Sequence, residues 1–258
     1  MRIALSSELP VRPGILGAAS RGFGLDHRMT PDMSSSAREN LSQRAYLRIR
    51  ASLIHSELHP GQRLVLRPLA AELQLSPTPV REALLRLVSE QALTLDERGS
   101  AIVPVIGPDE FSEITEVRCD LEGRAAARAA LHVGGSEIEQ LHSVAAAYGD
   151  AERCCDRAAM LASNAELHRL VCRMARAPLI LRFLEGIWMR IGPVYALKLQ
   201  EPATPAGEFG GGEAHERLLA ALRDGNPDGA RAAIVEDVRR SAGWLSHCLP
   251  QAAPLQAA

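Results

Sequence analysis

Two histidines on separate predicted helices are the residues of this sequence best suited to metal chemistry. His168 follows Asn164 by one helical turn, so the two side chains share a helical face. His215 opens a later helix, and Asp237 lies on the last one. Two imidazoles, a carboxylate and an amide oxygen converging from three helices would form a mixed nitrogen and oxygen site for a divalent cation. The alternative is that each histidine is a solvated or packed residue.

Two further side chains of the same region have candidate roles. Arg118 lies on a long predicted helix, and its bidentate guanidinium suits a carboxylate ligand. Alternatively, Arg118 forms an ion pair with Glu122, one turn further along. Cys172 follows His168 by one turn as an extra metal donor or a packed thiol, and we favour the packed thiol.

A second group of candidate residues lies within residues 67–87. The pattern of this stretch predicts two short helices joined by a tight turn. Arg81 and Arg86 lie off the apolar stripe of the second helix and can face an outside partner. A one-sided helix with arginine near its N-terminal end is typical of the DNA-reading helix in a helix-turn-helix. The stripe has helical spacing and consists of Val80, Ala83, Leu84, Leu87 and Val88.

The start of this second helix determines how its arginine is presented. Thr78 is a good N-cap, Pro79 suits the first helical position, and Glu82 in the first turn would face the positive end of the dipole. Arg81 can then pair with a guanine edge, while Arg67 and Thr78 suit phosphates. The alternative for Arg81 is a salt bridge within the domain.

The neighbouring segments complete a winged helix. Residues 38–59 predict a helix that ends at Pro60-Gly61. Residues 93–95 and 101–105 predict a β-hairpin with Gly99 in its turn. Arg98, Gly99 and Ser100 would form a wing tip that lies against a minor groove or phosphates.

The rest of the chain predicts only helices, so we expect a mostly α protein in which an antiparallel bundle follows the winged helix-turn-helix. The expected helices span 109–132, 136–147, 156–176, 179–200, 213–223 and 228–249, with a loop at 202–212. We therefore divide the chain into a disordered tail (1–37), a DNA-binding domain (38–106), an effector-binding and dimerisation domain (107–250) and a second tail (251–258).

Charge differs between these parts. Residues 38–106 hold nine arginines against seven acids, whereas residues 107–258 hold 16 basic against 21 acidic groups. A weakly basic N-terminal part on an acidic remainder suits a small DNA-binding module. Only 3% of the residues are aromatic, and 47% are hydrophobic, which predicts an aliphatic core.

Several features predict a cytoplasmic protein. No apolar run reaches the ~18 residues that a membrane span requires, and the N-terminus does not resemble a signal peptide. The five cysteines show no CxxC spacing, and we expect reduced thiols.

The residues of the predicted winged helix resemble the GntR family of bacterial transcription regulators. The resemblance rests on Pro60-Gly61 with Leu64, on 69–73, and on the run Ser76 to Leu84. It implies that Arg67, Arg81 and Gly99 match positions that contact DNA. Many members carry Arg or Lys where this chain has Pro77, so base specificity does not transfer from a relative.

Residues 108–249 resemble the FCD effector domain of the FadR branch of this family. Arg118 and Glu122 match the pattern of its first helix, and Leu167-His168 and the stretch from His215 to Ala230 match later elements. Metal-binding members use one Asp and three His. Here Asn164 stands at the Asp position and Asp237 at the last His position.

The resemblance therefore implies a divalent metal, zinc, nickel or manganese, at His168 and His215 with Asn164 and Asp237; a metal-free pocket is the alternative. It also implies a homodimer that binds a double-stranded operator and a small carboxylic acid, the latter through Arg118. The competing functions are a metal-dependent hydrolase or lyase, and a winged helix that makes only protein contacts. Against an enzyme, no HExxH or GxSxG motif is present.

Overall fold

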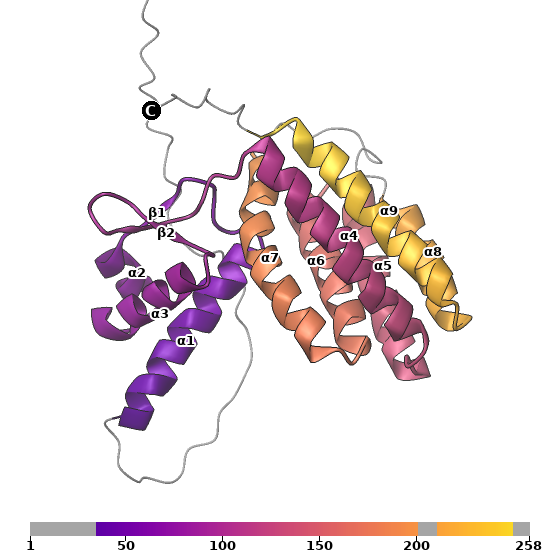
Figure 1. Ribbon diagram of the computed structural model, residues 1–258, viewed down its shortest axis with the longest axis horizontal. Coiled ribbons are helices and arrows are strands. Elements are labelled where there is room, and N and C mark those ends of the chain that lie inside the picture. The colour runs from indigo at the N-terminus through magenta and orange to yellow at the C-terminus, as the bar shows by residue number, and fades with distance from the viewer. Residues whose placement is uncertain (1–34, 201–210, 250–258) are drawn as a thin grey trace, which may run out of the picture.

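The protein is represented by a computed structural model that describes residues 35–200 and 211–249. Figure 1 shows a small domain of α1 to β3 beside a bundle of α4 to α9. This arrangement confirms the predicted fold class. The elements of the described residues are α1 (Ser35–Ile54), β1 (Arg63–Leu64), α2 (Leu66–Glu72), α3 (Pro77–Ser89), β2 (Thr94–Leu95), β3 (Ala101–Ile102), α4 (Pro108–Ala130), α5 (Gly135–Arg153), α6 (Arg157–Met174), α7 (Pro178–Lys198), α8 (Gly211–Arg223) and α9 (Pro227–Ser246).

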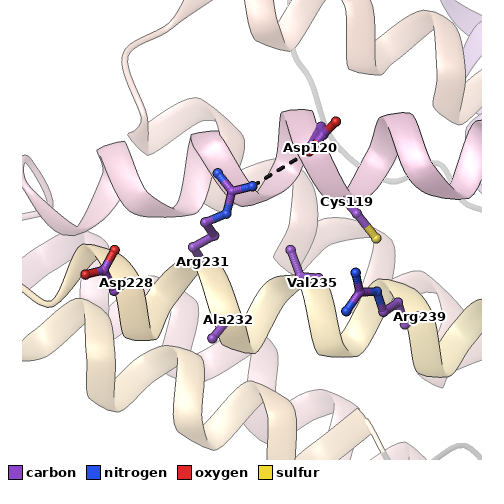
Figure 2. Close-up of a pocket in the computed structure, with 7 residues that line it drawn as sticks. All are labelled: Cys119, Asp120, Asp228, Arg231, Ala232, Val235 and Arg239. Carbon is purple, nitrogen blue, oxygen red and sulfur yellow. Dashed lines mark ion pairs between the residues drawn. The ribbon is translucent and has the colours of Figure 1, made fainter.

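The bundle is built around the pair of helices α4 and α9, which lie antiparallel and in close contact (Figure 2). Their approach requires a small residue, because a Cβ on Gly123 would lie 3.0 Å from Val235 and 3.2 Å from Arg231. At one end of the pair, Gly225 before α9 lies beside the carbonyl of Ala130. Helix α8 packs on α9, and α5 packs on α6.

Helix α7 joins the bundle to the winged helix. Gly192 approaches the end of α1 so closely that a Cβ there would lie 2.0 Å from the Leu53 carbonyl oxygen. Met189 packs into the core of the small domain. Arg190 donates a 2.6 Å hydrogen bond to the Gln91 carbonyl and forms an ion pair with Glu110. The two domains are therefore in direct backbone contact.

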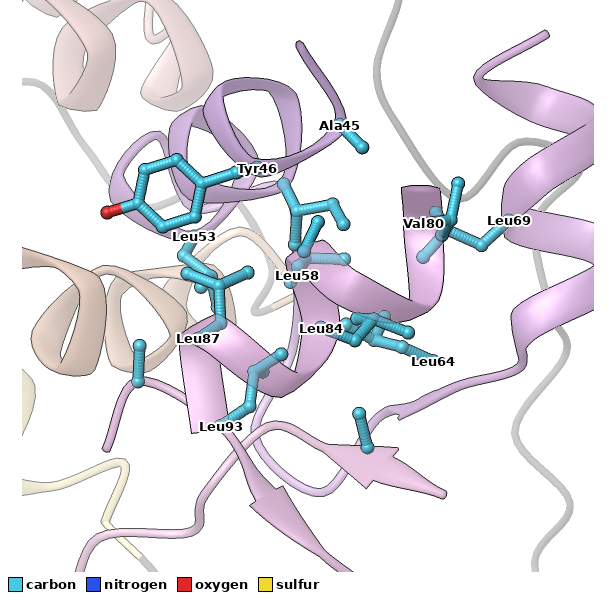
Figure 3. Packing of buried hydrophobic residues seen from close by; sticks show 14 of the residues in the cluster. Ala45, Tyr46, Leu53, Leu58, Leu64, Leu69, Val80, Leu84, Leu87 and Leu93 are labelled. Atoms are coloured by element: carbon cyan, nitrogen blue, oxygen red, sulfur yellow. The ribbon is translucent and has the colours of Figure 1, made fainter. Parts of the chain in front are cut away.

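The core of the winged helix is aliphatic and is drawn in Figure 3. Helix α3 contributes the stripe that the sequence predicted, with Val80, Ala83 and Leu87 fully buried. These residues pack against α1, the helix with which α3 has its main contact. The α1 side of this core consists of Ala45, Tyr46, Ile49 and Leu53.

The predicted hairpin is present, although β3 ends at Ile102 rather than at 105, and a strand that the sequence did not reveal extends it. Thr94 pairs with Ile102, and Gly99 occupies the turn with a φ of 75°, a conformation that favours glycine. On the other side of β3, Arg63 pairs with the same Ile102. The strand β1 has two residues, too few for an alternating pattern.

The bounds of three predicted helices are corrected. Helix α1 begins at Ser35, inside the predicted tail, and ends at Ile54 rather than at 59, because Ser56 adopts a left-handed φ of 62°. Helix α3 has Ser76 as its N-cap and Pro77 at its start, so Thr78 is not the cap and Glu82 is not in the first turn. Helix α5 continues beyond the predicted 147 to Arg153.

The expected tails at 1–34 and 251–258 lie outside the described residues, as does 202–210 of the expected loop. Residues 211 and 212 belong to α8.

Candidate functional site

The five residues that we expected at DNA lie on the surface of the winged helix. Arg67 on α2, Thr78 and Arg81 on α3, and Arg98 and Gly99 in the wing are all exposed. They come from α2, α3 and the wing turn. An exposed arginine near the N-terminal end of such a helix can enter a major groove, while the wing lies beside it.

The wing turn is held by the side chain of Asp96. The Asp96 carboxylate accepts hydrogen bonds from the N–H groups of Ser100 at 2.7 Å and Arg98 at 3.0 Å. These bonds hold the pKa of Asp96 below its usual range. Arg63 forms an ion pair with the same carboxylate at 2.6 Å. The turn therefore presents Arg98 at a defined position.

Arg86 corrects one of our interpretations, because it faces α1 rather than an outside partner. Its guanidinium lies 3.7 Å from the centre of the Tyr46 ring. Its Nη1 donates to Gln43 at 2.8 Å, and its Nε donates to Glu90 at 3.0 Å. The guanidinium of Arg86 is therefore engaged within the domain, although half of its side chain is exposed.

The second candidate site is a network of charged residues inside the bundle. Arg118 on α4 donates through Nε to Glu122 at 2.7 Å and through Nη1 to the Tyr195 hydroxyl at 3.3 Å. Trp188 donates to the same Glu122 oxygen at 3.0 Å. The other Glu122 oxygen is hydrogen-bonded to His168 Nδ1. The expected ion pair of Arg118 with Glu122 is thus present, and Arg118 also faces α7.

The network continues from His168 to α9. His168 Nε2 lies 2.7 Å from Asp237 Oδ2, so the imidazole is clamped between two carboxylates. All four charged residues of this network are buried, at 5% exposure or less. They come from three helices: Arg118 and Glu122 from α4, His168 from α6 and Asp237 from α9.

Electrostatics hold each member of this network in its charged form. Burial opposes the charge on His168, but Glu122 and Asp237 outweigh it and raise the pKa of the imidazole to about 9. Burial likewise opposes the charge on Glu122, but Arg118 and His168 lower the pKa of this carboxyl to about 2. The hydrogen bond from His168 holds the pKa of Asp237 below its usual range. Two cations therefore face two anions.

His215 and Asn164 extend the network as the sequence predicted. His215 Nε2 donates to Asn164 Oδ1 at 3.0 Å and lies 3.6 Å from Asp237 Oδ1. The ring of Tyr148 packs edge-on against His215 at 4.5 Å between centroids. Within the described chain, the buried atoms His215 Nδ1 and Asp237 Oδ1 have no hydrogen-bond partner.

The four predicted metal ligands thus lie together, and their nitrogen and oxygen donors suit a divalent cation in kind. Glu122 behind His168 is the carboxylate that often orients a ligating imidazole. The arrangement itself is closed by hydrogen bonds: a cation would have to replace the proton between His168 and Asp237. Over residues 35–200 and 211–249, no three His, Cys, Asp or Glu side chains are grouped to hold an ion.

Cys172 lies in the same region without joining the donors. Its side chain is buried within the apolar core of the bundle. Burial raises the pKa of its thiol well above the usual range, so the sulfur stays protonated and is a poor metal ligand.

A cavity of about 40 Å³ adjoins the network at the junction of the two domains. This exceeds the ~15 Å³ that one buried water requires. Residues of both the bundle and the DNA-binding domain line this cavity, so a molecule bound there would contact both domains. Its walls include Arg118, Asn164, His168, Trp188 and Tyr195 from the bundle, and Ile54 and Ser56 from the end of α1.

Sequence reasoning missed part of this wall. Trp188 and Tyr195 are aromatic residues on a predicted helix, which usually signals packing. Ser56 follows the end of α1, where we had expected a continuous helix. No feature of the sequence distinguishes these three residues from other residues of the predicted helices, so sequence reasoning could not have found them.

No helix among the described residues has the length and apolarity that crossing a membrane demands.

Comparisons with known proteins agree with this two-part architecture. Residues 41–103 match the model of "Bacterial regulatory proteins, gntR family", and residues 113–240 match the FCD domain. The chain is 31% identical over 188 residues to the HTH-type transcriptional regulator McbR of Escherichia coli K12, covering 73% of this chain and 85% of McbR. An uncharacterised HTH-type transcriptional regulator of Agrobacterium vitis is 33% identical over 124 residues, which is 47% of this chain and 71% of that protein.

Solved structures give the same result. The structure of E. coli McbR/YncC matches with a TM-score of 0.76 and 29% identity, over 80% of this chain and 97% of that one. A GntR transcriptional regulator from Rhodococcus sp. RHA1 matches with a TM-score of 0.64 at 16% identity, over 80% of this chain and 97% of that one, and so shows the fold alone.

Proposed function

The chain belongs to the gntR family of bacterial transcriptional regulators, in the FadR-like branch with an FCD domain, and we propose that it is a homodimer. We propose that its affinity for an operator changes when a small organic acid binds. It is a DNA-binding regulator and not an enzyme, so the alternative of a metal-dependent hydrolase or lyase no longer applies. We propose that it acts in the cytoplasm.

The DNA-contacting residues that we propose are Arg67, Thr78, Arg81, Arg98 and Gly99. The observation that carries this assignment is the exposure of Arg81 in the N-terminal half of α3. Arg81 would read a base edge, and Arg67 and Thr78 would position the helix on phosphates. Two such helices on a two-fold axis suit a pseudo-palindromic operator.

A gel shift on DNA from upstream of the gene tests this assignment. We expect a salt-dependent shift that Arg81→Ala weakens by about 1–3 kcal/mol. Arg86→Ala is the matched control on the same helix, because its guanidinium is turned toward Tyr46. DNA binding that ignores Arg81→Ala at low salt would contradict the proposed reading surface.

The effector site that we propose is the cavity at the domain junction. A carboxylate would pair with Arg118 and accept a hydrogen bond from Tyr195, both of which line the cavity. The same molecule would contact Ile54 and Ser56, so it would favour one placement of the winged helix over another. The effector thereby changes the spacing of the two DNA-reading helices.

Thermal-shift screening of small carboxylic acids tests this site, because a ligand of the folded state raises its stability. We expect at least one acid to raise the melting temperature of the wild type. Arg118→Lys keeps the charge but loses the guanidinium fork, and should abolish the rise. A rise that survives Arg118→Lys and Tyr195→Phe would place the ligand elsewhere.

We also propose that a divalent cation, zinc, nickel or manganese, can enter the network at His168, His215, Asn164 and Asp237. The unpartnered buried atoms of His215 and Asp237 support this proposal. Metal analysis of the purified protein tests it, with metal added back to chelator-treated protein. No bound metal, and an unchanged ligand response in His168→Ala/His215→Ala, would exclude it.

A further inference from the structure

A short stretch of α7 contacts both the candidate cavity and the winged helix. Figure 1 shows α7 on the side of the bundle that faces the small domain. Trp188, Ile191 and Gly192 line the cavity. Met189, between them, packs into the core of the winged helix. The neighbouring Arg190 forms hydrogen bonds with the end of α3 and the start of α4. A displacement of this stretch would therefore be felt in both domains.

The Arg190 guanidinium lies between two helix ends that belong to different domains. Its Nη1 donates a 2.6 Å hydrogen bond to the carbonyl of Gln91, two residues beyond the end of α3. Its Nε donates at 3.1 Å to Glu110, in the first turn of α4. The helix dipole favours a cation at the C-terminal end of α3 and an anion at the N-terminal end of α4. Arg190 therefore holds the end of α3 to the start of α4.

The Gln91 carbonyl is itself fixed to α3. Gln91 has a left-handed φ of 58°, and its N–H donates to the Val88 carbonyl at 3.0 Å. The next N–H, of Ala92, donates to the Leu87 carbonyl at 2.9 Å, so the turn closes the last carbonyls of the helix. Leu87 is fully buried in the core of the winged helix. A displacement of the Gln91 carbonyl is therefore passed to the whole helix rather than absorbed by a loose loop.

Arg81 lies on the same helix as this contact. It precedes Gln91 by ten residues, which is about 15 Å along the helix axis. A rotation of α3 by about 10° at its C-terminal end would displace Arg81 by about 2–3 Å. An N–H···O hydrogen bond does not tolerate such a displacement, because its length is limited to about 3.2 Å. The contact at one end of α3 thus decides whether the other end can hold a base edge.

We propose that Arg190 is the positioning residue that couples the cavity to the DNA-reading end of α3. A molecule that displaces Trp188 shifts α7, and Arg190 transmits this shift to the carbonyl of Gln91 and so to α3. The inference rests on the proposed function and adds the route by which a ligand of the cavity alters DNA binding.

The coupling is reciprocal, which allows a test that needs no effector. If the cavity alters the affinity of α3 for DNA, DNA bound at α3 must alter the cavity by the same coupling free energy. Trp188 reports on the cavity, because it is buried in the cavity wall and its indole N–H donates to Glu122 at 3.0 Å. The chain has two tryptophans, and Trp244→Phe leaves Trp188 as the single reporter.

Tryptophan emission of the full chain, titrated with a duplex of its upstream DNA, tests the proposal. In the Trp244→Phe background we expect the emission maximum of Trp188 to shift as the duplex binds. Arg190→Met removes both hydrogen bonds with a side chain of similar length, and we expect it to abolish this shift while a gel shift still shows bound DNA. A residue with a merely structural role would not separate these two readouts.

The matched control is Arg182→Met, which removes an exposed arginine of the same helix and should leave the Trp188 response unchanged. Arg190→Lys keeps the charge and one donor for the Gln91 carbonyl. It should give a weakened response, and it serves as the second variant if circular dichroism shows that Arg190→Met is unfolded. With Trp188→Phe, the remaining Trp244 on α9 lies outside the cavity wall and should not respond to DNA.

Three results would overturn the proposal. Trp188 could stay silent while the parent chain binds the duplex, the response could survive Arg190→Met, or folded Arg190→Met could lose DNA binding altogether. Failure of the proposed operator is a separate result, because a chain that ignores its upstream DNA is titrated instead with a duplex of unrelated sequence at low salt. Exposed arginines bind such a duplex without reading bases, and the same outcomes then decide the coupling.

Discussion

The winged helix and the bundle bury different kinds of residue. The small domain packs aliphatic side chains around α3, and its buried polar residues are the serines Ser52 and Ser56. Within the described chain, every buried residue with a charged or imidazole side chain lies in the bundle. The described part of the winged helix thus buries no charged or imidazole side chain, whereas the domain with the candidate ligand site buries several.

This difference teaches how each domain is suited to its task. An exposed arginine can contact a large external polyanion without any conformational change, and its removal leaves the fold intact. A buried network is costly to break because every charge depends on its partner. Under the proposed function, a small molecule that competes for those partners would alter the bundle, whereas the exposed arginines of the winged helix need no such change to contact DNA.

The largest effect should come from removing one charge of the buried network. Glu122→Gln leaves Arg118 and His168 without their shared carboxylate, and we expect the bundle to lose about 3–5 kcal/mol of stability. Chemical denaturation followed by tryptophan fluorescence measures this loss, since both tryptophans lie in the bundle. Glu116→Gln, on the exposed side of the same helix, is the control and should change stability by less than about 0.5 kcal/mol. Equal effects of the two variants would mean that the network does not stabilise the bundle.

The pH dependence of stability should show the same contrast. The pKa of His168 rises from 6.5 to about 9 on folding, so its contribution is complete below pH 6.5 and is lost as the pH rises through 9. The loss is on the order of 3 kcal/mol. Denaturation of chelator-treated protein at pH 6 and pH 9.5 measures it.

His168→Gln is the control for this alkaline loss and should flatten it. Glu122 and Asp237 contribute to stability with the opposite pH dependence. Their contributions are present above the ordinary carboxyl pKa and are lost in acid. If His168→Gln loses as much stability between pH 6 and pH 9.5 as the wild type, groups other than His168 cause the alkaline loss.

The contact between the domains should be sensitive to one methyl group. Gly192→Ala places a Cβ 2.0 Å from the Leu53 carbonyl, and we expect overpacking to cost about 1–3 kcal/mol. Gly186→Ala on the same helix meets nothing within 4 Å and should instead stabilise α7 by about 0.5–1 kcal/mol. Thermal denaturation of the two variants measures the difference. A neutral Gly192→Ala would show that α1 and α7 separate easily.

The smallest expected effect is the difference in stability between substitutions of two arginines of α3. Arg86→Ala removes the contact with Tyr46, and we expect a loss of about 1 kcal/mol of stability in the winged helix. Arg81→Ala should leave stability within about 0.5 kcal/mol. Thermal melts followed by circular dichroism measure both. A larger loss for Arg81→Ala would favour the alternative that its guanidinium forms a salt bridge within the domain.

Much of the winged helix was predictable because its signals are local. Pro60-Gly61, Pro77 and Gly99 mark breaks and turns through backbone constraints that do not depend on distant residues. The apolar stripe of α3 has one helical period, and its buried members are those that the period selects. The errors lie at helix ends, where Ser56 takes a left-handed φ and Ser76 an extended conformation, in the missed strand β1, and in the interpretation of Arg86.

The candidate site inside the bundle was predictable only in part. A resemblance to a family placed Asn164, His168, His215 and Asp237 in one group, and the structure places them in contact. It did not indicate that Glu122 would hold both Arg118 and His168, because His168 reaches the second oxygen of this carboxylate only after α4 and α6 have packed.

The sequence by itself therefore determined the helices, the wing and the exposure of the residues that we propose to contact DNA, since turn chemistry and helical periodicity act over a few residues. Only the tertiary structure decided which charges are paired, where the cavity opens, and that Gly192 brings α7 against α1. The physical reason is distance along the chain. Arg118, His168 and Asp237 have no local relation to one another, and only the packing of α4, α6 and α9 brings their side chains within hydrogen-bond reach of shared partners.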